Sequence, residues 1–531
     1  MDHHAARVAG ITVPLFSLRT ERSWGIGSIG DLLPFAEWIA QAGLSLVQLL
    51  PLAEGSGASA SPYAALSAFG IDPIYIDVDD LPGLEGSPTA LLSDDERAAL
   101  AAVQAAGTVD YQTVARLKDR VLSAAFDTFH AQESTVQGPL GREFIDFMAR
   151  HAAWLDNLAL FRALKTAHHG APWWEWSTPL RDRERSALLQ AQETLSREIL
   201  AIKYRQWVAD RQWSAARASL RAQGVELMGD LPFMVDRDSA DVWSRGDQFR
   251  LDMSVGVPAD QFDPDGQDWG MPPYDWARMA GDDFTWLRRR CAYAGHLYDR
   301  FRIDHLVGFY RTYMRPFAAR RDRRGKLVPG AFSPSGAAAQ LAHGERVLRA
   351  MLQGAASTGA RLIAEDLGCI PDFVPPSLAG LGVPGYKVLI WEKEDDARTF
   401  TDPRRYPALS VACFGTHDTD PVAAWWEGLG RGERAAAADL LGIPRASTPA
   451  QFTPAIHDAL CRQLLGARSE LVLLLIQDVL GSRARINTPG TLGEHNWTYR
   501  LPAPVEVLAA DAGVRAILAR LRRAVSESDR G

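Results

Sequence analysis

Three carboxylates in the second half of the chain each follow a short apolar segment. They are Asp304, Glu365 and Asp418. Any one of them has a structural explanation, because Asp and Glu often cap helices or pair with Arg where a strand ends. Together with Arg302, two residues before Asp304, they form a set that favours catalysis over a purely structural role.

This set suits the cleavage of a glycosidic bond with retention. That chemistry needs one ionised carboxylate to attack the anomeric carbon and a second that holds a proton for the leaving oxygen. Arg302 supplies the positive charge that keeps Asp304 ionised, whereas the apolar residues before Glu365 predict a raised pKa for that carboxyl group. Asp418, beside His417, is placed to bind sugar hydroxyls.

Other functions of the same residues stay open from these patterns. Asp230, Asp304 and Glu365 would suit Mg²⁺ and enolate chemistry, with Lys387 or His417 as the base, although the arginine beside Asp304 would repel a cation. A non-catalytic glucan-binding module would show stacking aromatics without a proton-holding Glu. A pyridoxal-phosphate enzyme using Lys387 would need a phosphate cradle after a strand, and the sequence offers none.

The elements that would position these residues repeat a strand-then-helix rhythm. Apolar segments predict eight strands, at 11–15, 45–50, 225–231, 301–306, 361–367, 386–391, 410–414 and 471–476. Helical patterns separate most of them. Eight strands that alternate with helices predict a (β/α)8 TIM barrel. In this α/β fold the polar C-terminal ends of the strands meet at one mouth of the barrel. A doubly wound open sheet is the alternative, but it would not bring carboxylates from so many strands together.

Long helical patterns interrupt this rhythm and predict a large, mainly helical inserted subdomain over 82–212. Its helices are expected at 111–133, 142–168 and 183–211. The chain then divides into 1–81 with the first two barrel strands, the insertion, and 213–531 with the remainder of the barrel. In the last part, the Asp-, Gly- and Pro-rich stretch 251–280 predicts a lid loop, which aromatics such as Phe262 favour as ordered.

Composition excludes several classes of protein. The chain has 531 residues, 47% hydrophobic and 23% charged, as in ordinary globular proteins too large for one simple core. The net charge of −8, without a block of Lys or Arg, disfavours nucleic acid. Four scattered cysteines fit a reducing compartment, and no apolar run is long enough to span a bilayer, so we expect a cytoplasmic protein without membrane partners.

Around these residues the chain resembles the amylomaltases, also called 4-α-glucanotransferases or disproportionating enzymes, which are relatives of the α-amylases. The resemblance runs from about Arg7 to about Arg500. It rests on separate stretches in a fixed order: Ser61-Pro62-Tyr63, Ser67-Ala68-Phe69, Trp154-Leu155, Ala159-Leu160-Phe161, Gly229-Asp230-Leu231-Pro232, Asp238 to Trp243, Arg302-Ile303-Asp304-His305, Ala364 to Gly368, Gly415 to Asp418, Asn487 to Gly490, and Asn496-Trp497.

The resemblance implies a role for each acid. By it, Asp304 is the nucleophile, Glu365 the general acid and then base, and Asp418 the carboxylate that distorts and holds the sugar. Further positions that match substrate-binding or supporting residues of the family are Tyr63, Asp230, Trp269, Arg302, His417, Asn487 and Trp497. The family fold is a (β/α)8 barrel with inserted subdomains and no C-terminal β-sandwich, and no metal or organic cofactor is implied.

The activity implied is transfer of an α-1,4-glucan segment to the 4-hydroxyl of an acceptor glucan or glucose. The route is a double displacement through a glycosyl-enzyme intermediate. The expected partners are maltodextrins, with glycogen or starch as further candidates, and the chain is expected to be a monomer or a small homo-oligomer. Hydrolysis of α-glucans is the main alternative.

Three positions depart from the pattern of the family. Met271 and Thr419 stand where many relatives carry Asn, and the common Gly-Arg-Trp-Val stretch survives only loosely as residues 325–328. The acids are intact, so the departures bear on acceptor binding, on preferred chain length and on the balance between transfer and hydrolysis.

Overall fold

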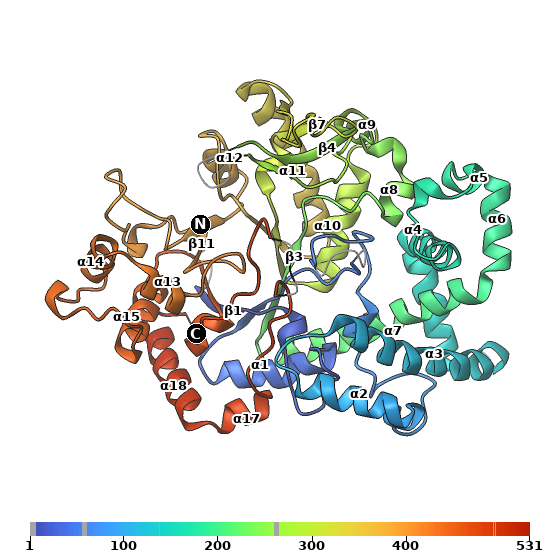
Figure 1. Cartoon of the computed structure of the whole chain (residues 1–531), viewed down its shortest axis with the longest axis horizontal. Coiled ribbons are helices and arrows are strands. Elements are labelled where there is room, and N and C mark those ends of the chain that lie inside the picture. Colours follow the sequence, from blue (N-terminus) through green and yellow to red (C-terminus); the bar gives the residue numbers. More distant parts are fainter. Residues whose placement is uncertain are drawn as a thin grey trace.

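The computed structural model describes residues 7–55, 61–136, 138–259, 265–491, 493 and 495–530 (Figure 1). Its central sheet contains eight parallel strands, at β1 (Val8–Thr12), β2 (Leu46–Gln48), β3 (Glu226–Leu231), β6 (Arg300–Ile303), β9 (Arg361–Ala364), β10 (Gly385–Val388), β11 (Ser410–Cys413) and β12 (Leu471–Leu475). Their order is β10-β11-β12-β1-β2-β3-β6-β9. Each of the eight predicted strands is therefore present.

The two ends of this sheet meet and close it into a barrel. The backbone N–H of Ala364, at the end of β9, donates to the carbonyl of Pro384, just before β10, at 2.9 Å. The predicted (β/α)8 barrel is thus confirmed, and an open doubly wound sheet is wrong. Several strands end a few residues earlier than the sequence predicted, for example at Ile303 and Ala364 instead of at residues 306 and 367. At β6 the reason is local, because His305 adopts a left-handed conformation with φ of 45°.

The inside of the barrel is filled by side chains from alternate strand positions. They form one buried cluster that includes Leu46, Met228, Ile363, Val411 and Leu473. Such a packed interior closes the barrel below its mouth, so polar chemistry is confined to the C-terminal ends of the strands. The outer faces of the same strands are buried against helices, as their nearly continuous apolar sequences predict.

Helices surround the barrel on the outside. In chain order they are α1 (Leu32–Ala40), α7 (Ser196–Ala222), α10 (Thr285–Leu297), α11 (Ala337–Ala356), α12 (Val374–Gly380), α13 (Val422–Gly428), α14 (Arg431–Leu440), α15 (Pro454–Leu465), α16 (Ile476–Leu480), α17 (Val505–Ala510) and α18 (Ala512–Glu527). In the described part of the chain, no helix is long and apolar enough to cross a membrane.

Between β2 and β3 the chain is helical, and these helices project to one side of the barrel (Figure 1). They are α2 (Asp94–Ala105), α3 (Tyr111–Val136), α4 (Pro139–Ala167), α5 (Thr178–Arg181), α6 (Arg185–Thr194) and α7. The single helix predicted over 183–211 is wrong, because the chain breaks at Leu195. The inserted subdomain was expected to end at residue 212. α7 runs unbroken past that residue and contacts both α4 of the insertion and α1 of the barrel, so this boundary stays a prediction.

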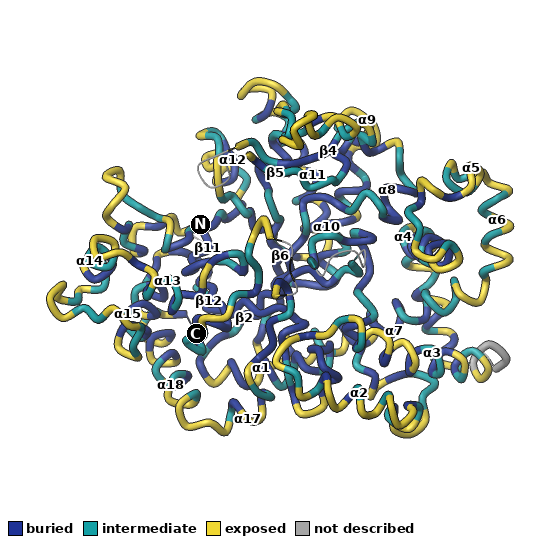
Figure 2. The backbone as a smooth tube through the Cα atoms, viewed as in Figure 1, coloured by how far each residue is buried: buried dark blue, intermediate teal, exposed yellow. Residues whose placement is uncertain are grey.

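A second, antiparallel sheet lies beside the barrel and is the main feature that the sequence did not predict. It consists of β5 (Gln267–Asp268), β4 (Met253–Val257), β7 (Thr312–Pro316) and β8 (Ala331–Ser333), in that order. The stretch expected to be a lid loop contains β4, β5 and most of α9 (Trp276–Gly281), so its described residues contribute to this sheet and to a helix. Its residue Phe262 lies outside the described residues. Figure 2 shows β4 as largely buried.

Candidate active site

Arg302 on β6 is the centre of a buried network of charges. Its Nη1 donates to both carboxylate oxygens of Asp230 on β3, at 2.8 and 2.7 Å. Its Nη2 lies 2.9 Å from Asp304 Oδ1 and 4.0 Å from Glu365 Oε2. Because β3, β6 and β9 are parallel neighbours in register, the acids at their C-terminal ends converge on one guanidinium group.

The carboxyl group of Glu365 is in the state that a proton donor needs. Burial is the largest cause that raises its pKa, to about 8, and the neighbouring charge of Asp304 acts in the same direction. The Arg302 guanidinium and the hydrogen bond from the His305 backbone lower the pKa and only partly offset these effects. Glu365 is therefore protonated near neutral pH, while Asp304 is paired with a cation.

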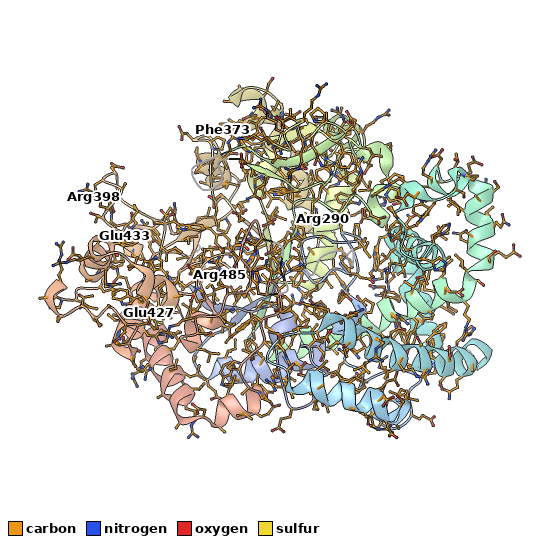
Figure 3. All side chains as sticks on the ribbon, in the orientation of Figure 1. Arg290, Phe373, Arg398, Glu427, Glu433 and Arg485 are labelled. Atoms are coloured by element: carbon orange, nitrogen blue, oxygen red, sulfur yellow. The ribbon has the colours of Figure 1, made fainter. Side chains whose placement is uncertain are left out.

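Asp418 lies on the loop after β11 and is held by a separate set of contacts. Asn487 Nδ2 donates to its Oδ1 at 2.6 Å, and Arg485, labelled in Figure 3, donates to its backbone carbonyl at 2.6 Å. The hydroxyl of Thr419 ties the same loop, since it accepts from the backbone N–H of Thr416 and donates to its carbonyl. This departure from the family pattern therefore positions the loop that carries Asp418.

Tyr63 connects the loop of Asp418 to the buried charges. Its hydroxyl donates to Asp230 Oδ2 at 2.8 Å and lies 3.1 Å from His417 Nε2. The Tyr63 and His417 rings are stacked with centroids 5.5 Å apart, and Trp497 lies 5.8 Å from each of them. His417 Nε2 in turn lies 3.4 Å from Asp418 Oδ2.

Trp269 reaches the site from the antiparallel sheet. Its ring packs edge-on against His305 at a centroid distance of 5.0 Å, and its Nε1 donates to Gln267 Oε1. Burial lowers the pKa of His305 to about 4, so that ring is neutral. Met271 contributes to the same sheet through its backbone carbonyl, which accepts from Val255 N–H at 2.9 Å.

The structure thus brings every predicted site residue into one chain of contacts, from Asn487 through Asp418, His417 and the Tyr63 hydroxyl to Arg302 and its acids. Sequence reasoning missed Asp366, which lies beside Glu365. The carboxylate of Asp366 accepts the Tyr386 N–H at 2.6 Å and occupies the space where Gly385 has no Cβ. A glycine directly before a predicted strand, Gly385 before 386–391, was the available signal for this close approach.

The magnesium alternative does not fit this geometry. Asp230, Asp304 and Glu365 are gathered around the Arg302 guanidinium, which occupies the position that a cation would need. Of the two bases named for that alternative, Lys387 pairs with Glu392 at 3.3 Å, and His417 Nε2 lies 3.1 Å from the Tyr63 hydroxyl. Among the residues that the structure describes, no cluster of His, Cys, Asp or Glu could hold a metal ion.

In (β/α)8 barrel enzymes the active site lies at the C-terminal ends of the strands, which is where the carboxylates of this chain converge. The fold and the site therefore define a barrel enzyme. The chain belongs to the 4-alpha-glucanotransferase family, because the profile of that family matches residues 13–506.

Individual relatives agree with this assignment. The 4-alpha-glucanotransferase of Chlamydia pneumoniae is 32% identical over 514 residues, covering 94% of this chain and 92% of that one. The enzyme of the same name from Thermus thermophilus is 34% identical, covering 90% and 92%. An amylomaltase from Streptococcus agalactiae, solved in complex with acarbose, superposes with a TM-score of 0.81 at 26% identity and covers 99% of this chain and 100% of that one.

Proposed function

We propose that this enzyme transfers segments of an α-1,4-glucan to the 4-hydroxyl of an acceptor glucan or glucose by a retaining double displacement. The observation that carries the proposal is the pair of acids around Arg302. Asp304 and Glu365 each have an oxygen within 4.0 Å of one Arg302 nitrogen. Such closeness favours the retaining separation of about 5 to 5.5 Å over the wider inverting one.

In the first step, Glu365 protonates the glycosidic oxygen while Asp304 attacks the anomeric carbon. The bond to the leaving glucan breaks, and a glycosyl-Asp304 ester forms. The raised pKa of Glu365 supports its role as the acid, and the ion pair with Arg302 supports Asp304 as the nucleophile. Asp418, fixed by Asn487, binds the hydroxyls of the sugar at the cleavage point.

In the second step, the now ionised Glu365 takes the proton of the acceptor 4-hydroxyl, whose oxygen displaces Asp304 and forms the new glycosidic bond. Transfer exceeds hydrolysis only if the acceptor excludes water. The segment 251–280 would supply that exclusion, because its Trp269 packs against His305, next to the nucleophile. Removal of this segment with an unchanged ratio of hydrolysis to transfer would contradict the assignment.

The substrate class and setting follow from the same reasoning. Maltodextrins are the proposed donors and acceptors in carbohydrate metabolism, with glycogen or starch as larger donors, and the acarbose complex of the Streptococcus enzyme supports an α-glucan site. Free cysteines, of which Cys291, Cys413 and Cys461 are buried, support a reducing cytoplasm.

Incubation with maltotriose alone tests the proposal. Transfer gives glucose together with a ladder of longer maltodextrins, which chromatography resolves. Glucose and maltose alone would mean a hydrolase, and no turnover would leave only a binding module. The same incubation with EDTA is expected to give the same ladder, because the acids surround an arginine; loss of activity would contradict the mechanism.

A further inference from the structure

A cavity of about 380 Å³ lies between the helical insertion and the barrel, away from the candidate active site. It is formed where α4 meets α10 and the short helix α8 (Ala240–Ser244). Its lining residues are Ser67, Phe69, Arg150, His151, Ala153, Trp154, Asn157, Ala240, Asp241, Ser244, Arg245, Arg289, Ala292, Tyr293 and His296. None of these belongs to the proposed catalytic or sugar-binding set.

Three arginines line this cavity without a counter-charge. Arg150 lies on α4, Arg289 on α10 and Arg245 directly after α8. Arg150 and Arg289 are exposed and Arg245 is half-buried, and none of the three lies within ion-pair distance of a carboxylate among the described residues. The chain carries a net charge of −8 and has 65 acidic residues, so acidic partners are not scarce. An unpaired group of guanidinium ions around one cavity is typical of a site for an anion.

Arg183 adds a fourth positive charge beside the cavity. Its Nη2 donates to the lining residue Asn157 at 2.9 Å, whereas its Nη1 is buried without a hydrogen-bond partner among the described residues. Burial and the neighbouring Arg245 lower the pKa of this arginine. Arg183 is not itself on the lining, but an anion bound beside Arg245 would relieve the repulsion between the two arginines.

Asp241, the one carboxylate on the lining, does not neutralise these arginines. Its Oδ2 accepts from the Ser67 hydroxyl at 2.9 Å and from the Ala68 N–H at 2.8 Å, and its Oδ1 accepts from Trp286 Nε1 at 3.1 Å. These hydrogen bonds commit the carboxylate to positioning the chain after Tyr63. Asp241 is therefore not available as a counter-charge for the three lining arginines.

Aromatic rings form another part of the lining. Trp154 is stacked on Phe69, with centroids 6.0 Å apart and 10° between the planes, and Tyr293 lies 5.4 Å from Trp154. The Trp154 Nε1 donates to His151 Nδ1, which fixes the indole in place. Flat, partly exposed aromatic faces bind the apolar face of a sugar ring, and cavities of about 300 Å³ and more hold small organic ligands.

We propose that this cavity binds a phosphorylated monosaccharide. The phosphate would lie between Arg245 and Arg289, with the charge of Arg183 beside them, and the sugar ring would lie against Trp154 and Tyr293. Because the cavity shares no residue with the active site, the proposal stands apart from the glucanotransferase mechanism and is tested by binding instead of turnover.

Calorimetric titration of the whole enzyme with glucose 1-phosphate and glucose 6-phosphate tests the proposal. At least one of the two sugar phosphates is expected to bind. Glucose and inorganic phosphate should each bind at least about tenfold more weakly, because glucose lacks the phosphate that the arginines bind and inorganic phosphate lacks the ring that the aromatic side chains contact. Absence of binding by both sugar phosphates at millimolar concentration would overturn the proposal. Equal binding of inorganic phosphate would do so too, because it would mean an adventitious ion only.

Variants place the ligand in this cavity. Arg245→Gln and Arg289→Gln should each weaken binding about tenfold, because each removes a charge-assisted hydrogen bond. Trp154→Ala should weaken binding of the sugar phosphate but not of inorganic phosphate. The control Arg515→Gln, at an exposed position of α18, should bind as the parent does. Unchanged binding in both cavity arginine variants, or displacement of the sugar phosphate by maltotriose, would overturn the proposal. Circular dichroism and unchanged maltotriose turnover verify that the variants fold.

Discussion

The backbone N–H of His305 donates to Oε2 of Glu365 at 2.6 Å, so the residue after the proposed nucleophile holds the proposed acid. This bond engages one carboxylate oxygen and leaves Oε1, which accepts only a longer bond from Leu367 N–H at 3.3 Å, as the position for the proton. Any shift of β6 against β9 would therefore move nucleophile and acid together.

The pH dependence of turnover is the first prediction. Glu365 must be protonated for the first step, and its pKa is raised to about 8 by burial and by Asp304. We expect kcat/KM on maltotriose to fall about tenfold per pH unit above a pH of about 8, because only the protonated enzyme reacts. Stopped initial-rate assays across the alkaline range measure this limb. A limb centred near pH 5 would contradict the assignment of Glu365 as the acid.

Glu365→Gln provides the matched variant for this prediction. It should lose nearly all activity on maltotriose but keep much of the first step on α-maltosyl fluoride, whose leaving group needs no protonation. Its rate of fluoride release should also lack the alkaline limb. Equal losses on both donors would assign Glu365 a purely structural role.

Glu365 also predicts how stability depends on pH. In the unfolded chain its carboxyl group ionises above a pH of about 4.3, whereas in the folded protein it stays protonated up to a pH of about 8. Between these values ionisation favours the unfolded chain, so this group destabilises the fold increasingly as pH rises. The melting temperature of Glu365→Gln should therefore rise relative to the parent from pH 5 to pH 8 and change little beyond. A constant difference across this range would contradict the raised pKa.

The barrel could be predicted from the sequence because its evidence is local and repeated. Each strand is a short apolar run, and each of Asp230, Asp304 and Glu365 lies where a run ends, so parallel pairing alone brings these acids together. For Arg302 only the pairing with Asp304 was predicted, and its two hydrogen bonds to Asp230 were not. The three acids can be located from their own stretches of sequence, without knowing which distant segments they contact.

The antiparallel sheet could not be predicted in the same way. β5 has two residues and pairs with β4 across a loop, and β4 pairs with β7 about sixty residues further along the chain. These strands depend on tertiary contacts more than on their own sequences. The link from Tyr63 to Asp230 and His417 likewise joins three distant segments, so residue types suggested these side chains but not their hydrogen bonds.

Loss of the nucleophile gives the third prediction. Asp304→Asn should fold, because Arg302 keeps its bonds to Asp230, and should lose transfer by roughly 10⁴-fold or more. Chromatography of maltotriose reactions measures the loss, and circular dichroism verifies the fold. Asp322→Asn, in an exposed turn, is the matched control and should retain activity. Near-parental activity in Asp304→Asn would overturn the mechanism.

The last prediction concerns the buried ion pair between Arg302 and Asp230, whose side chains are 7% and 0% exposed. Arg302→Met should cost about 3–5 kcal/mol of unfolding free energy, because Asp230 would remain as a buried charge without its cation. The double variant Arg302→Met/Asp230→Asn should recover most of that stability, since position 230 no longer carries a buried charge, yet it should stay inactive because Asp304 has lost its partner.

Denaturant unfolding and maltotriose turnover separate these two effects. The exposed pair of Arg349 and Glu345, 3.5 Å apart, supplies the control, and Arg349→Met should leave the unfolding free energy nearly unchanged. If the double variant is as unstable as Arg302→Met, the cost lies in lost packing and not in the uncompensated charge. If it regains transfer, then Arg302 acts only to hold Asp230, and the function of Asp304 does not depend on this arginine.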